Sequence, residues 1–488
     1  MAETFSDMGV PVFMADVKGD IAGMMKAGTD SEDMQKRIAK FGLAEAGFTY
    51  HGYPVTLWDI YGKKGIQLRT TISEMGPLLL SRILELNDLQ SDILTIVFKI
   101  ADDNKLLLVD TKDLKAILNR INDHRGDFEE QYGKMSTASI SAIIRSVVAL
   151  EVAGGDVFFG EPALNISDWF SLGEGGKGMI HILDSESLIH NGKMYSAFLL
   201  WMLSELFETL PEVGDLPKPK MVFFFDEAHL LFDEASKQLL DKIEQVVKLI
   251  RSKGVGVYFC TQNPKDIPDG VLAQLGNKVQ HALRAYTPSD QKAVKAAAMS
   301  FRTNPAFDTA ETIVSLGTGK AVVSFLGEDG VPGMAEKVSV LPPQCSMGGI
   351  NDDEREQTIK GSLLYSKYAK SYDPDSAYEF LQRIGQEEAA KAEAEVLAQK
   401  KAEEDAKLAK EEAKANEKAQ KEAEREARKE EAARNRAIKS VGNSVLGTIG
   451  RAAGRSLGGS VGGSLGKNVG GNLGASLIRG IFGTLFKQ

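Results

Sequence analysis

The sequence predicts an α/β fold, with a mostly parallel sheet flanked by helices, a helical insertion, and a charged helix and glycine-rich tail at the carboxyl end. Short apolar runs alternate with helical patterns through the first two thirds of the chain, as they do in βα units. Most of these runs end on Asp, Glu or Gln, and open α/β sheets bind their ligands at the carboxyl edge. A ligand site is therefore expected at that edge.

Each of the apolar runs is expected to form a strand. The run KMVFFFDE at 220–227 is apolar enough to lie in the middle of a sheet, and the last run begins a terminal hairpin. In chain order the predicted strands are Val10–Asp16, Tyr53–Asp59, Gly178–Asp184, Lys220–Glu227, Gly254–Gln262, Lys278–Arg284 and Ala321–Leu326.

The composition of the chain indicates its domains. Residues from about 72 to 153 are mostly helical in pattern, and we interpret them as an insertion into a core that spans 1–345. A connector at 346–372 leads to a segment at 373–440 that is rich in Ala, Glu, Lys and Arg and has almost no apolar stripe. It is either a solvated helix, held by Glu–Lys pairs worth about 0.3 kcal/mol each, or a disordered charged linker.

The tail at 441–488 repeats a four-residue unit that ends on an apolar or small residue followed by glycine, in register from Gly450 to Gly474, and it is basic, with no acidic residue beyond Glu431. Glycine costs about 1 kcal/mol per helical position, so a helix here needs a partner. Two interpretations stay open: a helix whose glycine stripe packs against a protein partner or a membrane surface, and a flexible tail.

Composition also excludes some classes of protein. The net charge is -10, so the chain is not basic throughout. The amino-terminal residues lack the basic and apolar regions of a secretory signal. The two cysteines, Cys260 and Cys345, form no disulfide framework, which predicts a reducing compartment and hence a cytoplasmic protein.

The stretch KPKMVFFFDEAHLLFDEA, from Lys218 to Ala235, has the pattern of a Walker B element, a buried strand that ends in two acids. In nucleotide hydrolases the first acid, here Asp226, holds Mg²⁺ through water, and the second, here Glu227, polarises the attacking water. The alternative is a purely structural acid pair. A DEAH-box helicase is disfavoured, because no QRxGR motif accompanies the DEAH sequence.

A phosphate-binding loop, GxxxxGK[ST], is absent from the 488 residues. The three nearest matches, SLGEGGKGMI, SLGTGKAVV and LGKNVGG, lack either the first glycine, the Ser/Thr or the strand-to-helix context. The opening MAETFSDMG reads as the end of a helix that leads into a buried strand. We expect that a first strand, the loop and most of a helix precede this point.

Several long motifs together resemble the HerA/FtsK superfamily of P-loop ATPases, and in particular its bacterial HerA-like, YjgR-like branch. They occur in the family's order over residues 1 to about 344, and the charged segment and the tail resemble the family more loosely. The sequence departs from the family pattern in lacking the Walker A motif, which family members carry just upstream of the position of Met1. The motifs are GVPVFMADVKGD, GYPVTLWDIYGKKGIQLRTTISEMGPLLLSRILELND, FFGEPALNISD, VFFFDEAHLLF and CTQNPKDIPDGVLAQLGNKVQHALRAYTPSDQKAVKAAA.

The resemblance implies roles for residues that match the family's motifs. Asp226 matches the Mg²⁺-associated acid and Glu227 the catalytic base. Gln262, in CTQNP, matches the polar residue that senses the γ-phosphate, and the alternative is that it caps the turn before Asn263. Arg284, in HALRAYTP, matches an arginine that contacts phosphate from the same or a neighbouring subunit.

Two further residues match a motif near the nucleotide, Asp16 and Lys18 in ADVKGD, although Lys18 followed by glycine is also ordinary turn chemistry. Arg284 could instead be a surface-pairing residue, with Arg251 or Arg302 as the trans-acting arginine.

The resemblance implies a RecA-like motor that binds ATP and Mg²⁺, assembles into a ring, commonly a hexamer, and couples hydrolysis to movement on DNA. Without the loop, we expect weak or absent ATPase activity from residues 1–488 alone. The alternative function is a non-catalytic RecA-like scaffold subunit whose tail docks on a partner or membrane surface. A DNA-binding protein without motor activity has little support, because the core shows no recognition helix or zinc pattern.

Overall fold

The computed structural model describes residues 1–233 and 237–441. The chain forms two units, Met1–Ala392 and Glu393–Gln488. Beyond Val441 the glycine-rich tail lies outside the described part of the chain, so both interpretations of it stay predictions.

The first unit is built on a six-stranded sheet with the order β3-β2-β4-β1-β5-β6, in which every pair of neighbours is parallel. The predicted α/β class is therefore confirmed. The short strand β3 escaped the sequence analysis because two residues carry no periodicity. The strands are β1 (Val12–Asp16), β2 (Val55–Asp59), β3 (Ile66–Gln67), β4 (Ile180–Asp184), β5 (Met221–Phe225) and β6 (Val255–Phe259).

Both faces of the sheet are covered, as the fully apolar strands require. On one face Phe13 and Phe223 belong to the large apolar core that also includes Phe198 of α9. On the other face Phe224 lies 6.5 Å from the ring of Phe5 in α1. The helices around the sheet are α1 (Ala2–Asp7), α2 (Glu32–Lys40), α9 (Gly192–Thr209), α10 (His229–Asp233), α11 (Lys237–Leu249) and α12 (Asp269–Leu272).

The predicted helical insertion is present between β3 and β4. Its helices begin with strong caps, including capping boxes at Thr71, Asn87 and Asp110. One segment of the described chain, Thr137–Phe158, is long and apolar enough to cross a membrane, and its buried residues pack in the insertion's core. The helices are α3 (Ile72–Ile83), α4 (Asp88–Asp103), α5 (Thr111–Asp123), α6 (Arg125–Tyr132), α7 (Thr137–Leu150) and α8 (Asp156–Phe158).

A second, antiparallel sheet has the order β7-β8-β9 and contains the predicted hairpin. The strand expected at Lys278–Arg284 is shorter than predicted, because the pairing with β8 stops at Gln280 and the chain then turns to α13, which Thr287 caps. The elements are β7 (Lys278–Gln280), β8 (Lys320–Ser324), β9 (Glu336–Ser339), α13 (Pro288–Met299) and α14 (Thr309–Ser315).

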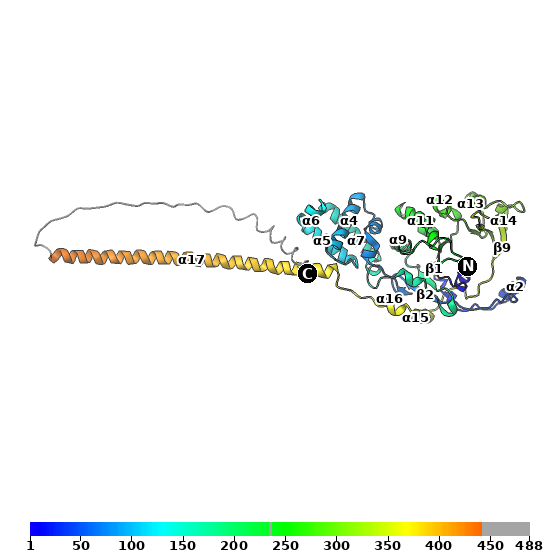
Figure 1. Cartoon of the computed structure of the whole chain (residues 1–488), viewed down its shortest axis with the longest axis horizontal. Coiled ribbons are helices and arrows are strands. Elements are labelled where there is room, and N and C mark those ends of the chain that lie inside the picture. Colours follow the sequence, from blue (N-terminus) through cyan, green and yellow to red (C-terminus); the bar gives the residue numbers. More distant parts are fainter. Residues whose placement is uncertain (234–236, 442–488) are drawn as a thin grey trace. The chain divides into compact units, whose positions relative to one another are not determined.

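The connector contains α15 (Asp352–Gly361) and α16 (Tyr365–Tyr368), and the charged segment is a continuous helix, α17 (Ala377–Val441) (Figure 1). The start of α17 packs on the insertion, where Arg120 of α5 makes two hydrogen bonds of 2.6 and 2.7 Å to Glu388. From Glu393 to Arg434 every side chain is exposed, so the helix continues without an apolar contact face, as its composition predicts.

Candidate active site at the carboxyl edge of the sheet

Parallel pairing brings the ends of three strands together. Ala15 near the end of β1 is in register with Phe225 of β5, and Phe225 is in register with Phe259 of β6. The turn after β1, the acids after β5 and the loop after β6 therefore meet at one edge, although they are far apart in sequence. This is the edge at which open α/β sheets bind ligands.

The carboxylate of Glu227 lies at the centre of this meeting point. Lys18 Nζ, from the turn after β1, lies 2.5 Å from its Oε1 atom. The Gln262 side-chain amide, from the loop after β6, donates to Oε1 and Oε2 at 3.2 and 3.0 Å. His229 Nδ1 lies 3.3 Å from Oε2. With only 6% of Glu227 exposed, these side chains form most of its polar surroundings.

The charge of Glu227 is stabilised by these partners. Burial acts to raise its pKa, but the hydrogen bonds from Lys18 and Gln262 and the charge of Lys18 outweigh burial and hold the pKa below its usual value. The same pair raises the pKa of Lys18. Glu227 is therefore an anion at neutral pH.

The backbone at Glu227 is left-handed, with φ +47°. This conformation costs a residue with a Cβ atom roughly 1–2 kcal/mol. Glu227 lies two residues after the end of β5, and its conformation lets Ala228 N–H donate to the Cys260 carbonyl at 2.8 Å, so that the chain turns toward β6. Strain of this kind gathers at functional sites, where the surrounding structure holds it in place.

Asp226 is half-buried beside Glu227. Burial raises its pKa, and its carboxylate accepts the backbone N–H of Glu227. Mg²⁺ keeps several waters and takes one or two carboxylates plus substrate phosphates, so a single acid of this kind fits a water-mediated role. In the part of the chain that the structure describes, no cluster of three or more His, Cys, Asp or Glu residues could hold a metal ion by itself.

Asp16 holds the turn that follows β1, and its place near the nucleotide stays a prediction. Its Oδ1 accepts the N–H groups of the turn that follows, at 2.7 Å from Gly19 and at 3.2 and 3.3 Å from the neighbouring residues, and its Oδ2 accepts Ile21 N–H at 3.1 Å. Asp59 holds the turn after β2 in the same way. Asp16 thus builds the turn that carries Lys18 to Glu227.

The loop after β6 is also held from within. Thr261 donates to Asp266 at 2.7 Å, and Asn263 caps the short helix Pro264–Asp266. Gln262 lies between these two residues. Its amide is therefore positioned toward Glu227, and capping of the turn is done by Asn263.

Arg284 lies outside this cluster. Its guanidinium donates to the carbonyls of Val314 and Leu316, the second at 3.0 Å, and no contact with Glu227 is recorded among the described residues. Arg251 pairs with Asp215 at 3.1 Å, and Arg302 donates to the Pro332 carbonyl at 3.3 Å. A role for any of these arginines at phosphate stays a prediction.

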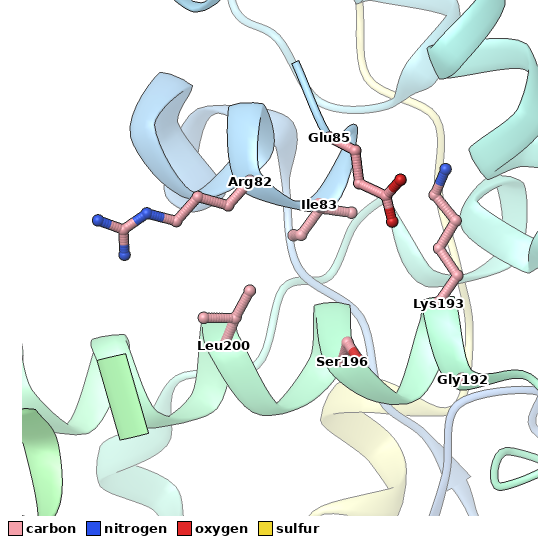
Figure 2. Close-up of a pocket in the computed structure, with 7 residues that line it drawn as sticks. All are labelled: Arg82, Ile83, Glu85, Gly192, Lys193, Ser196 and Leu200. Carbon is pink, nitrogen blue, oxygen red and sulfur yellow. The ribbon is translucent and has the colours of Figure 1, made fainter. Parts of the chain in front are cut away.

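A cavity of about 170 Å³ lies between the end of α3 and the start of α9 (Figure 2). Its polar lining consists of Arg82, Glu85, Lys193 and Ser196, and Figure 2 shows the Arg82 side chain extending away from Glu85 and Lys193. None of the predicted site residues lines it. It is therefore separate from the Glu227 cluster.

Two features of the site were missed from the sequence. The first is the contact of His229 with Glu227, for which the place of His229 two residues after that acid is a signal. The pairing of Lys18 with Glu227 had no sequence signal, because it depends on β1 lying beside β5.

The chain belongs to the family described as "Helicase HerA-like C-terminal", whose model matches residues 1–466. It is 30% identical over 146 residues to "Probable helicase MJECL08" of Methanocaldococcus jannaschii, which is 29% of this chain and 26% of that protein. It is 31% identical over 99 residues to "DNA double-strand break repair helicase HerA" of Sulfolobus acidocaldarius, 20% of this chain and 19% of that protein. The matches thus span about a quarter or less of these curated relatives.

Two solved structures are similar over most of the chain. The plasmid coupling protein TrwB in complex with the ATP analogue ADPNP is 13% identical, covers 69% of this chain and 88% of its own, and has a TM-score of 0.41. VirB4 of Thermoanaerobacter pseudethanolicus is 15% identical, covers 69% and 82%, and has a TM-score of 0.39.

Proposed function

We propose that this chain supplies the acidic part of the ATP site of a HerA-like P-loop ATPase. The observation that carries the proposal is the Glu227 carboxylate, buried at the ends of β5 and β6 and held by Lys18 and Gln262. Membership of the HerA-like family supports the same activity.

In this proposal Glu227 is the general base. Its carboxylate accepts the proton of the water that attacks the γ-phosphate, and such a base contributes roughly 10²–10⁴ in rate. Gln262 orients Glu227 and contacts the γ-phosphate. The buried surroundings strengthen these interactions, because charges attract more strongly where water is excluded.

Asp226 would hold Mg²⁺ through water, which suits its half-buried carboxylate. When bound, the ion neutralises charge on the phosphates. Arg284, or another arginine from the same or a neighbouring subunit, would stabilise the transferring phosphate, a contribution worth about 10³–10⁵ in rate in known systems.

Residues 1–488 alone are expected to hydrolyse ATP weakly or not at all, because they contain no GxxxxGK[ST] sequence. Backbone N–H groups and the lysine of such a loop bind most of the phosphate charge.

We propose further that the ATPase works as a ring of identical subunits, a hexamer, and moves on DNA in the manner of a translocase or helicase. Two relatives are described as helicases, one of them in DNA double-strand break repair. A gel-shift titration at 50 and 200 mM salt checks this, because displacement of counterions from phosphates makes DNA binding weaken steeply with salt.

A non-catalytic scaffold is the second candidate. The absence of GxxxxGK[ST] and the engagement of Arg284 with two backbone carbonyls favour it. Its tail would dock on a partner or a membrane surface. An in-frame GxxxxGK[ST] upstream of the Met1 codon supports the ATPase, and stop codons there support the scaffold.

The direct test compares Mg-ATP hydrolysis by the chain with that of Glu227→Gln. Glu186→Gln is a matched control, since Glu186 lies near the same edge and also pairs with a lysine, Lys64, but is exposed. We expect the wild-type chain to hydrolyse Mg-ATP at or near the background rate of Glu227→Gln, because residues 1–488 contain no GxxxxGK[ST] sequence. Sustained turnover by residues 1–488 that Glu227→Gln leaves intact would contradict the role of Glu227.

A further inference from the structure

The cavity of about 170 Å³ lies where the end of α3, in the helical insertion, meets the start of α9, a helix of the core (Figure 2). Lys193, Ser196 and Leu200 form its α9 wall, because residues three and four apart lie on one face of a helix. Ile83 and Leu200 are buried and make its apolar part. A cavity of about 150 Å³ can hold a molecule as large as benzene, so this one has room for a small organic ligand.

The polar side chains around the cavity have no partners of their own. Within the described ranges, 1–233 and 237–441, no hydrogen bond or ion pair is recorded for the side chains of Arg82, Glu85, Lys193 and Ser196. Figure 2 shows the Glu85 carboxylate and the Lys193 ammonium group extending toward the same space, while the Arg82 guanidinium extends away from it. One negative and one positive group thus border the cavity, and neither is neutralised by the protein.

Glu85 occupies a backbone position at which glycine is the usual residue. Its φ is +55°, and it follows the last turn of α3, where its N–H donates to the Arg82 carbonyl at 3.1 Å and Leu86 N–H donates to the Ser81 carbonyl at 3.0 Å. These two bonds define a Schellman motif, in which glycine adopts the left-handed conformation without strain. Strain of this kind gathers at ligand-binding sites. The Glu85 carboxylate is therefore placed at the cavity despite a less stable backbone.

We propose that this cavity binds a small zwitterion, a free α-amino acid with a short apolar side chain. Its ammonium group contacts Glu85, and its carboxylate contacts Lys193 and Ser196. The ligand would join the helical insertion to the core, because Glu85 follows α3 and the other two residues belong to α9.

The pair of opposite charges selects this class of ligand. A simple anion such as phosphate is attracted by Lys193 but repelled by Glu85, and a simple cation meets the reverse. A free α-amino acid carries an ammonium group and a carboxylate on one carbon, so it satisfies both side chains. The positive end of the α9 dipole, whose first residue Gly192 lines the cavity, favours the carboxylate on the same side as Lys193. Ile83 and Leu200 receive the short apolar side chain.

Isothermal titration calorimetry of the full chain with L-valine tests the proposal. Valinamide, which lacks the carboxylate, and N-acetyl-L-valine, which lacks the ammonium group, are the matched ligands, and L-tryptophan tests the limit of size. We expect L-valine to bind, and each modified valine to bind at least about tenfold more weakly, because each loses one charge-assisted hydrogen bond. L-Tryptophan should not bind, because its side chain is too large for the cavity.

Variants of the lining residues locate the site. Glu85→Gln and Lys193→Gln should each weaken L-valine binding at least about tenfold, whereas Arg82→Gln should leave it unchanged, because the Arg82 side chain extends away. Glu85→Gly should abolish binding and raise the midpoint of thermal denaturation, since glycine relieves the left-handed backbone. A purely structural role for Glu85 would lower that midpoint instead.

Three results would overturn the proposal. The first is the absence of L-valine binding in both calorimetry and equilibrium dialysis. The second is binding of inorganic phosphate as tight as that of L-valine, which would make this a simple anion site. The third is L-valine binding that survives both Glu85→Gln and Lys193→Gln, which would place the ligand elsewhere. None of these results bears on the Glu227 cluster, whose residues do not line the cavity.

Discussion

Asp16 and Glu227 both lie at the carboxyl edge of one sheet, and their carboxylates are used differently. Asp16 is the last residue of β1, and its carboxylate accepts four backbone N–H groups of the turn that follows. Glu227 follows β5, has a left-handed backbone, and contacts side chains from three segments. Backbone partners fix a turn, whereas side-chain partners can exchange with a ligand. The type of partner therefore separates a structural acid from a candidate catalytic one.

The largest expected effect on stability comes from a residue inside the sheet, away from the acids at its edge. His181 in β4 is fully buried between Trp58 and the Trp169 carbonyl, and burial lowers its pKa to about 3. The unfolded chain, with a histidine pKa of about 6.5, binds more protons below that pH, so the free energy of unfolding falls by up to about 1.4 kcal/mol per pH unit between pH 6.5 and 3.

Urea denaturation at pH 7 and pH 5 checks this, with His181→Gln as the comparison. We expect the wild type to lose about 2 kcal/mol more than the variant over this interval. Equal losses in both would show that His181 is not the group responsible.

Asp16→Ala should cost about 1–2 kcal/mol, because the N–H groups of the turn lose their acceptor. Asp16→Asn keeps one oxygen and should cost less. Chemical denaturation measures both. If Asp16→Ala were neutral, the carboxylate would not be holding the turn, and the contrast with Glu227 would disappear.

Glu227→Gly should raise the free energy of unfolding, whereas Asp16→Ala should lower it. Glycine relieves the left-handed backbone, so we expect stabilisation of about 0.5–1 kcal/mol, with loss of any Glu227-dependent hydrolysis. Destabilisation by more than 1 kcal/mol would mean that Glu227 is needed for the fold rather than for chemistry.

Lys18→Gln should change stability least, by no more than about 0.5 kcal/mol, because 57% of the Lys18 side chain is exposed and Gln262 still donates to the buried Glu227 carboxylate when the lysine is removed. Lys64→Gln, which breaks the exposed pair with Glu186, is the matched control. Thermal denaturation should show similar small shifts for the two, and a much larger shift for Lys18→Gln would assign that pair a structural role.

Much of the fold could be predicted from the sequence, because buried parallel strands are continuous apolar runs such as that of β5. The adjacent acids Asp226 and Glu227 were likewise visible as a pattern. The order of the strands in the sheet could not be predicted, and that order brings Lys18 to Glu227 and places β6 at an edge of the sheet. The commitment of Asp16 to its own turn was also hidden, since an acid at a strand end has the same sequence signal in either role.

The central claim is that Glu227 is the base of an ATP site at the carboxyl edge of the sheet. The most direct measurement is Mg-ATP hydrolysis by the chain extended through an in-frame GxxxxGK[ST] segment, for the wild type, Glu227→Gln and Glu186→Gln. The account predicts that the extended chain hydrolyses Mg-ATP, that the rate falls roughly 10²–10⁴-fold in Glu227→Gln, and that it is unchanged in Glu186→Gln. Equal rates in the wild type and Glu227→Gln would contradict it.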